Sequence, residues 1–287
     1  MESARPVQLL EHDDGIDRWR MMRARPAVHL RGMIAEYCDY SERTASFAVR
    51  AELASTQAVM IFCLGDPLEL TGADGNAIRL KPGQAFVAGF ADGTSLSRGA
   101  GAQAGMHVAM DWSVMARLID APLAEIANRV VPLDLFGRHW RDVGDKLGEA
   151  SAGEARFGLL DGLLEASLHN GRVVDRTVAW AVGRLRADPD IRVDRLASDL
   201  DCSRRHFIAR FRDETGITPG RFARLARFER FWTGLAADPD ARLADLAQDA
   251  GYYDEAHLSR SVRDMAGMTP GALRAALIPG NGGFLAA

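Results

Sequence analysis

A short segment occurs twice in the second half of the chain, and it restricts the possible folds more than any other feature. Residues 213–222 read DETGITPGRF, and 51 positions later residues 264–273 read DMAGMTPGAL. In each copy a Gly and then Thr-Pro follow an amphipathic stretch. Gly commonly ends a helix, whereas Thr followed by Pro commonly begins the next one. The repeat therefore predicts two copies of one helical unit.

The repeated segment belongs to a larger unit in each copy. The first unit reads VDRLASDL and then SRRHFIARFRDET, and the second reads RLADLAQDA and then DEAHLSRSVRDMA. Each contains a short helix, a tight turn and a longer helix, which is the plan of a helix-turn-helix. Ala197 and Ala247 are the small residues that let the paired helices approach. Ser203 and Asp254 are suitable N-caps for the longer helices.

Helical geometry sorts the longer helices into a core face and an outward face. Phe207 and Phe211 share one face in the first copy, as Leu258 and Val262 do in the second. The outward faces carry matching positions in both copies: Arg205, Ala209 and Arg212, with Ile208 at the edge, and Ala256, Arg260 and Arg263. A solvated charged face would explain either helix alone. The agreement between two copies favours a surface that enters the major groove of DNA, where Arg pairs with guanine.

Residues 175–277 resemble the C-terminal DNA-binding domain of the AraC/XylS family of bacterial transcription regulators. The residues that carry the resemblance are LASDL with SRRHFIARFRDETGITPGRF, and LAQDAGY with AHLSRSVRDMAGMTPGAL. The resemblance implies two helix-turn-helix units on double-stranded DNA, joined by a long helix at about 218–235. The positions that match the family's base contacts are Arg205, Ile208, Ala209, Ala256, His257 and Arg260.

Polar residues around this reading face are expected to contact the DNA phosphates. Such contacts supply affinity without sequence information. We assign this role to Ser203, Arg204, Arg210, Arg212, Arg221, Arg224 and Arg263. Asp254 and Glu255 place acid at the start of the second longer helix, where capping is the favoured role. We therefore expect the first copy to anchor the protein more strongly than the second.

The first half of the chain has a different character. From about 45 to 111, short runs of β-branched and aromatic residues alternate with turn sequences such as GDP, GADGN and KPG, which predicts an antiparallel sheet or small barrel. Helical periodicity follows at about 112–168. The predicted fold is therefore α+β with two domains, an N-terminal β domain with helices at 1–172 and an all-α DNA-binding domain at 173–279. The resemblance implies that the N-terminal domain is a cupin-like barrel for sensing and dimerisation.

Control by a small-molecule effector or a protein partner, homodimerisation and contact with RNA polymerase are expectations for such a regulator. The apolar residues of 138–168 fit either packing against the barrel or a dimer interface. The alternative function is a metal-dependent cupin-type enzyme with an accessory helical domain. It would need clustered metal ligands, but His107 has no H-x-H partner, and His29 and His139 lie far from it in the sequence. We therefore predict no enzyme activity, no metal and no cofactor.

Composition restricts the compartment and the partners. The formal net charge of −4 argues weakly against nucleic acid, but a near-neutral domain can bind DNA when its arginines share one face. Three scattered cysteines argue against a disulfide framework or a zinc module and fit a reducing cytoplasm. The longest apolar run, AVMIFCL, is too short to cross a membrane.

Overall fold

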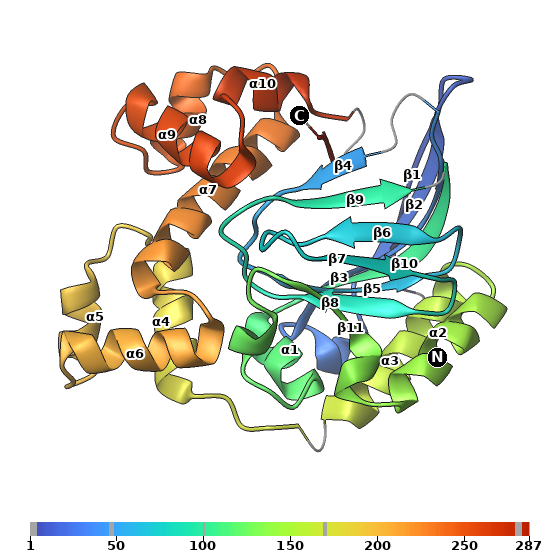
Figure 1. The fold of residues 1–287 in the computed structure, drawn as a ribbon, viewed down its shortest axis with the longest axis horizontal. Coiled ribbons are helices and arrows are strands. Elements are labelled where there is room, and N and C mark those ends of the chain that lie inside the picture. Colours follow the sequence, from blue (N-terminus) through green and yellow to red (C-terminus); the bar gives the residue numbers. More distant parts are fainter. Residues whose placement is uncertain (1–4, 46–48, 100, 169–170, 279–282, 287) are drawn as a thin grey trace.

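The computed structural model describes residues 5–45, 49–99, 101–168, 171–278 and 283–286. An N-terminal domain of antiparallel strands and short helices precedes a C-terminal helical domain, and the two lie side by side (Figure 1). This arrangement confirms the predicted α+β fold class. Positions 46–48 of the predicted first strand, 169–170 of the junction, and 279 at the predicted domain end lie outside the described residues.

The strands that the structure describes form two antiparallel sheets in the N-terminal domain. The larger sheet contains, in spatial order, β1 (Val7–Asp13), β2 (Arg18–Ala24), β3 (Ile34–Arg43), β10 (Ala102–Met110), β5 (Ala58–Cys63), β8 (Ala85–Ala88) and β11 (Val130–Pro132). The smaller sheet contains β12 (Phe284–Leu285), β4 (Val49–Glu52), β9 (Ser95–Gly99), β6 (Leu68–Thr71) and β7 (Ala77–Leu80). A cluster of Leu68, Leu70, Leu80, Cys63 and Phe86 joins the two sheets.

The strands extend beyond the stretch that the sequence indicated. Strands β1, β2 and β3 precede residue 45, and β11 follows residue 111. In β2, Trp19 and Met21 are buried while Arg18 and Arg20 are exposed, so the strand does alternate. The pattern is hard to recognise because Met and Arg have little preference for strands. The start of the predicted strand region at 45 was therefore wrong.

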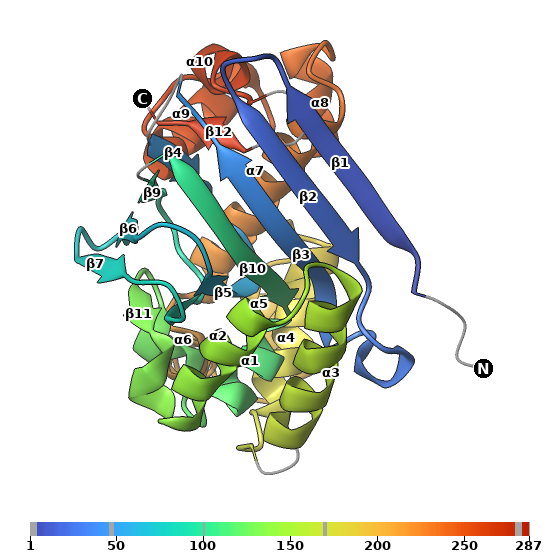
Figure 2. The same cartoon turned by 90° about the vertical axis from the view of Figure 1, so that its right-hand side faces the viewer.

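Helices cover the face of the larger sheet opposite the smaller sheet. They are η1 (Val28–Leu30), α1 (Trp112–Leu118), η2 (Leu123–Ile126), η3 (Leu133–Phe136), α2 (His139–Glu149) and α3 (Glu154–Leu168). Figure 2 shows α2 and α3 against the lower part of the sheet, with its upper part uncovered. Trp140 of α2 and Phe157 of α3 are buried in the main core, and Phe157 stacks on Tyr37 of β3 at 6.0 Å between ring centroids. The apolar residues of these helices therefore pack against the sheet.

The described residues of the C-terminal domain form seven helices: α4 (Arg176–Ala187), α5 (Val193–Asp199), α6 (Arg204–Thr215), α7 (Pro219–Ala237), α8 (Leu243–Asp249), α9 (Glu255–Ala266) and α10 (Pro270–Ala275). The repeated Gly and Thr-Pro residues end and begin helices in both copies, as predicted. Gly216 and Gly267 end α6 and α9 with φ of 81° and 71°, a left-handed conformation that suits Gly. The hydroxyls of Thr218 and Thr269 then cap α7 and α10 by accepting backbone N–H bonds. Beyond α10 the chain returns to the N-terminal domain, where β12 pairs with β4.

Candidate DNA-binding surface

The first helix-turn-helix consists of α5 and α6. Ala197 is buried where the two helices meet, and the Ser203 hydroxyl caps α6 by accepting the His206 N–H at 3.2 Å. Phe207 and Phe211 are fully buried and hold α6 against the core. Arg205, Ala209 and Arg212 are exposed on the opposite face, and Ile208 is half-buried at its edge. The structure therefore places the predicted reading residues of the first copy on one open surface.

The second unit, α8 and α9, repeats this geometry. Leu258 and Val262 are buried, whereas Ala256, Arg260 and Arg263 are exposed. The Asp254 carboxylate accepts the N–H of His257 at 2.6 Å, so the acid at the helix start is a cap as expected. The His257 ring lies edge-on to the buried Tyr252 ring, with 5.1 Å between centroids. His257 is thus partly engaged in the turn, and Ala256 and Arg260 are more accessible.

The arginines on this side of the domain fall into two groups. Four of the predicted phosphate contacts already have carboxylate partners: Arg204 with Asp194 at 3.1 Å, Arg221 with Asp92 at 2.7 Å, Arg224 with Asp264 at 2.6 Å, and Arg210 with Asp175. In contrast, the outward arginines of α6 and α9 form no ion pair with any residue that the structure describes: Arg205, Arg212, Arg260 and Arg263.

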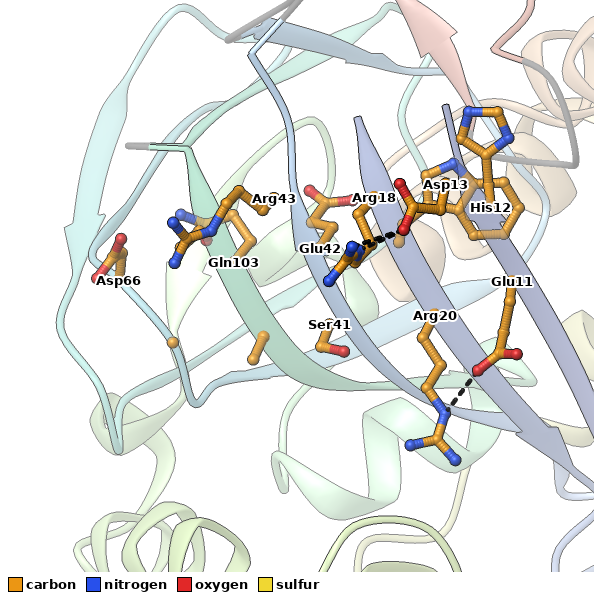
Figure 3. A pocket seen from close by; sticks show the side chains of 14 residues that line it. Glu11, His12, Asp13, Arg18, Arg20, Ser41, Glu42, Arg43, Asp66 and Gln103 are labelled. Carbon is orange, nitrogen blue, oxygen red and sulfur yellow. Dashed lines mark hydrogen bonds and ion pairs between the residues drawn. The ribbon is translucent and has the colours of Figure 1, made fainter. Parts of the chain in front are cut away.

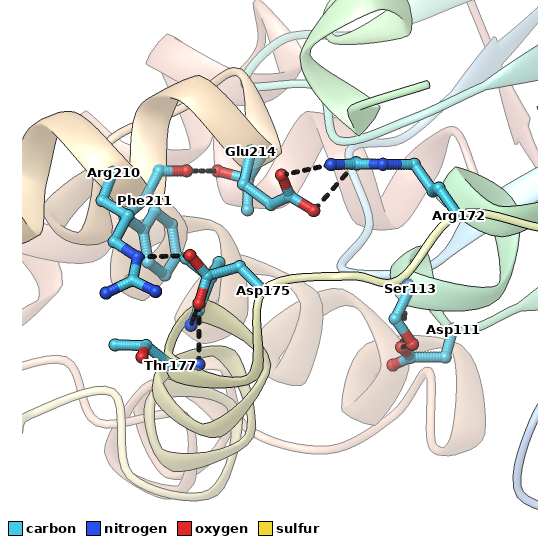
Figure 4. A network of polar contacts seen from close by, with 10 residues as sticks. Asp111, Ser113, Arg172, Asp175, Thr177, Arg210, Phe211 and Glu214 are labelled. Atoms are coloured by element: carbon cyan, nitrogen blue, oxygen red, sulfur yellow. Dashed lines mark hydrogen bonds and ion pairs between the residues drawn. The ribbon is translucent and has the colours of Figure 1, made fainter. Parts of the chain in front are cut away.

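Two of these carboxylates lie outside the helix-turn-helix units. Asp175 caps α4, and its side chain also holds Arg210 of α6, as Figure 4 shows. The Arg210 pair and the backbone N–H bonds lower the pKa of Asp175, against the opposing effect of burial. Asp92 belongs to the loop between β8 and β9 of the N-terminal domain, so its pair with Arg221 joins the two domains.

The first unit also packs directly on the N-terminal domain. Arg172 forms a bidentate ion pair with Glu214 of α6, in which its two terminal nitrogens lie 2.9 and 3.1 Å from the two carboxylate oxygens (Figure 4). Gly216 lies so close to η2 that an added Cβ would fall 2.2 Å from the Cβ of Ala127. Phe90 and Phe222 pack with their ring centroids 5.1 Å apart. The first unit and the start of α7 are therefore fixed to the N-terminal domain through an ion pair, a close approach of the backbone and a ring contact.

A second junction joins the segment after β4 to α4 and α7. Glu229 of α7 accepts hydrogen bonds from the Ser55 hydroxyl at 2.6 Å and from both the N–H and the hydroxyl of Thr56. Arg186 of α4 donates to the Thr56 carbonyl at 2.9 Å and pairs with Asp111 at 3.0 Å. We call these five residues the junction network. Sequence reasoning missed it, because its members are far apart in the chain and lie in no motif.

Polar side chains of β3, β4 and β10 lie on the sides of the two sheets that face each other. Arg50 of β4 and Glu42 of β3 form an ion pair of 2.5 Å with little exposure. The amide of Gln103 is buried, and neither of its polar atoms has a hydrogen-bond partner in the described part of the chain. Burial lowers the pKa of His107 to about 4, helped by the charge of Arg23, so this imidazole is neutral at pH 7. Buried polar groups without partners are costly, and a bound molecule can satisfy them.

An open hollow of about 730 Å³ lies on the larger sheet, on the same face as α2 and α3 but above them, where no helix covers the strands. Figure 3 shows its floor on β3 and β10 and a border of charged side chains from β1 and β2. Arg20 pairs with Glu11 at 3.4 Å, and Arg18 with Asp13 at 2.6 Å. No group of three or more metal-ligating side chains occurs in the residues described. No helix there is long and apolar enough to span a membrane.

Comparison with known proteins agrees with this architecture. A family model described as a helix-turn-helix domain matches residues 196–276. ToxT from Vibrio cholerae O395 is similar in fold, with a TM-score of 0.51 and 9% identity over 79% of this chain and 96% of that chain. Apo ToxT from strain SCE256, in a substituted form, gives 0.54 and 9% over 84% and 98%. ToxT bound to (E)-4-(8-methylnaphthalen-1-yl)but-3-enoic acid gives 0.50 and 9% over 91% and 98%. No curated protein sequence matches the chain.

The fold and the exposed surface define a two-domain, DNA-binding transcription regulator, with a β-sheet domain followed by a double helix-turn-helix. Residues 196–276 of the C-terminal domain are a helix-turn-helix domain, in agreement with the sequence resemblance. Helix α7, at Pro219–Ala237, is the predicted joining helix, displaced by one or two residues at its ends.

Proposed function

We propose that the protein reads a specific DNA site with α6 and α9 and that the N-terminal domain controls how tightly it binds. The boundary between the two domains would lie near residue 172. The base-reading set is Arg205, Ile208, Ala209, Ala256, His257 and Arg260, and the phosphate set is Ser203, Arg204, Arg210, Arg212, Arg221, Arg224 and Arg263. The observation that carries this proposal is that the corresponding helices of the two repeats, α6 and α9, each expose two arginines that form no ion pair with a described residue: Arg205 and Arg212, and Arg260 and Arg263.

Control by the N-terminal domain is supported by the position of β4. This strand contains Arg50, which faces the polar space between the sheets. The same strand pairs with β12, at Ala51 and Arg50, and the chain then continues to Ser55 and Thr56 of the junction network. A shift of β4 would therefore move contacts with α4, α7 and the chain end together. Such a shared element can couple two sites when it has two arrangements.

We propose a small-molecule effector for this space. One of the similar structures is of ToxT bound to an arylbutenoic acid. In this chain the support is chemical: the unpartnered Gln103 amide and the neutral His107 offer hydrogen bonds, while the charge of Arg50 is balanced by Glu42. Those groups suit a polar ligand without net charge. A thermal-shift screen of wild type beside Gln103→Leu tests this idea, because ligands of this site should stabilise only the wild type.

The remaining assignments follow from the proposed role. A regulator that reads DNA acts in the cytoplasm of a bacterium, can contact RNA polymerase when bound near a promoter, and binds symmetric or repeated sites as a homodimer. We propose that it has no enzyme activity. The alternative, a metal-dependent cupin-type enzyme, requires a cluster of ligands. Stoichiometric Fe, Mn or Zn in the purified protein would favour that alternative.

Selection of bound DNA from a random pool is the experiment that tests the function. We expect one enriched motif for the wild type, with loss of preference at one base pair for Arg260→Ala. Arg79→Ala is the matched control, because Arg79 is an exposed arginine on β7 of the N-terminal domain. Failure to enrich any sequence, or an equal effect of the two substitutions, would contradict the proposed reading surface.

A further inference from the structure

The larger sheet ends in an open edge at β1. This strand has seven residues, Val7–Asp13, and within the described part of the chain it pairs only with β2. Figure 2 shows nothing alongside its outer edge. Val7 and Leu9 are 40% and 48% exposed, and the strand contains no Pro or Lys and no register shift against β2. Natural proteins usually protect such an edge, because its unpaired N–H and C=O groups bind another strand.

The other terminal strands of the two sheets offer much shorter edges. Strand β11 has three residues and ends at Pro132, which cannot donate a backbone hydrogen bond. Strands β12 and β7 have two and four residues. The buried apolar residues of α2 and α3 pack on the sheet and are therefore not available to a partner. Strand β1 is therefore the longest edge among these that is open to a partner.

We propose that β1 pairs with β1 of a second copy of the chain, antiparallel and about a two-fold axis at Leu10. The proposal rests on the homodimer of the proposed function and assigns its interface. A two-fold axis perpendicular to the sheet preserves its faces, so each residue lies opposite a residue of the same face. With the axis at Leu10, Val7 lies opposite Asp13, Gln8 opposite His12, and Leu9 opposite Glu11. All seven residues are then paired.

Charge selects this register over its neighbours. An axis at Glu11 would place two Glu11 side chains directly opposite each other, and an axis at His12 would place Glu11 opposite Asp13. Like charges in directly opposed positions destabilise a pair of strands. An axis at Leu9 avoids the repulsion but leaves two residues of each strand unpaired. With the axis at Leu10, Glu11 and Asp13 keep their partners Arg20 and Arg18 on β2 and lie directly opposite Leu9 and Val7 of the second copy.

A pair of substitutions at Leu9 tests the register through the sign of the charge. Leu9→Glu places a carboxylate opposite Glu11 of the second copy, and the two-fold axis repeats this pair once more. The dissociation constant of the dimer should therefore rise about 2- to 30-fold. Leu9→Arg is the matched control and should retain the dimer, because Arg opposite Glu11 is attractive. Leu9 is exposed, so the fold should persist in both variants, which circular dichroism can verify. Mass from light scattering over a dilution series gives the dissociation constants.

Disulfide trapping gives a second readout. In a Cys202→Ser background, Leu10→Cys should form a covalent dimer under mild oxidation, since the two Cys would face each other at the axis. Gln8→Cys should not, because the two copies of position 8 would lie about 13 Å apart along the strands. A wild type that stays monomeric would overturn both the homodimer and this interface. A dimer that ignores the charge at position 9 and does not trap at position 10 would overturn the interface alone, and DNA selection would be unaffected.

Discussion

Replacement of Asp92 by Asn should tighten DNA binding through Arg221. In the free protein the guanidinium of Arg221 lies 2.7 Å from the Asp92 carboxylate, and 60% of the Arg221 side chain is exposed. A phosphate that takes Arg221 must first displace this carboxylate. Ion pairs of such exposure contribute about 0.2–1 kcal/mol. Removal of the competing charge should therefore lower the dissociation constant for DNA by about 1.4- to 5-fold.

A double-mutant cycle isolates this effect from a general change in net charge. Binding is measured by fluorescence anisotropy of labelled DNA at several salt concentrations. Arg221→Ala alone should weaken binding and reduce the salt slope by about 0.9. Asp92→Asn should then have no further effect in the Arg221→Ala background. Asp120→Asn, an exposed carboxylate without an ion-pair partner in the described residues, controls for charge. Tightening of the same size in both backgrounds would refute the competition.

Three further outcomes test other parts of the structure. Arg260→Ala should cost about 1–3 kcal/mol on the preferred DNA and far less on a site altered at the base pair it reads; an equal loss on both, by anisotropy, would remove Arg260 from the reading set. Glu229→Gln weakens the hydrogen bonds of Ser55 and Thr56 to a charged group, so hydrogen exchange should speed up at residues 54–56 but not in β6, and unchanged rates would exclude the junction as a control element. The neutral form of His107 is favoured in the folded state, whose pKa is about 4, so stability should be complete above the ordinary pKa of 6.5 and fall as pH drops from 6.5 towards 4, by at most about 3 kcal/mol. Urea unfolding of wild type and His107→Gln measures this, and identical pH profiles would contradict it.

The C-terminal domain could be predicted from the sequence because its information is local. Five of its described helices, α4, α6, α7, α9 and α10, begin at a residue whose side chain caps them, such as Ser203 or Thr218. Helices α6 and α9 end at Gly216 and Gly267, which adopt a left-handed backbone. The core faces follow from a period of 3.6 residues. A repeat then supplies a second, independent example of each feature. The reading surface follows from the same periodicity, because the residues on the side of a helix opposite its buried face are exposed.

The contacts between the domains could not be predicted in this way. Asp92 and Arg221 are 129 positions apart, and Glu229 accepts from Thr56 across 173 positions. Each residue alone has the pattern of a solvated surface charge. Strands β1 and β2 were not predicted for a different reason. Their exposed faces contain Arg and Glu, and the apolar face of β2 has Trp19 and Met21 in place of β-branched residues. Tertiary pairing decides these elements, and single-sequence periodicity contains little of it.

The division of the arginines has a consequence for how such a regulator can be controlled. The proposed base-reading arginines, Arg205 and Arg260, have no ion pair in the described structure, whereas Arg221 and Arg224 of the phosphate set are held by carboxylates. Base contacts determine which sequence is preferred, and phosphate contacts determine much of the affinity for any sequence. A movement of the N-terminal domain that frees or captures Arg221 would therefore change the occupancy of the site at a given protein concentration. It would leave the preferred sequence unchanged.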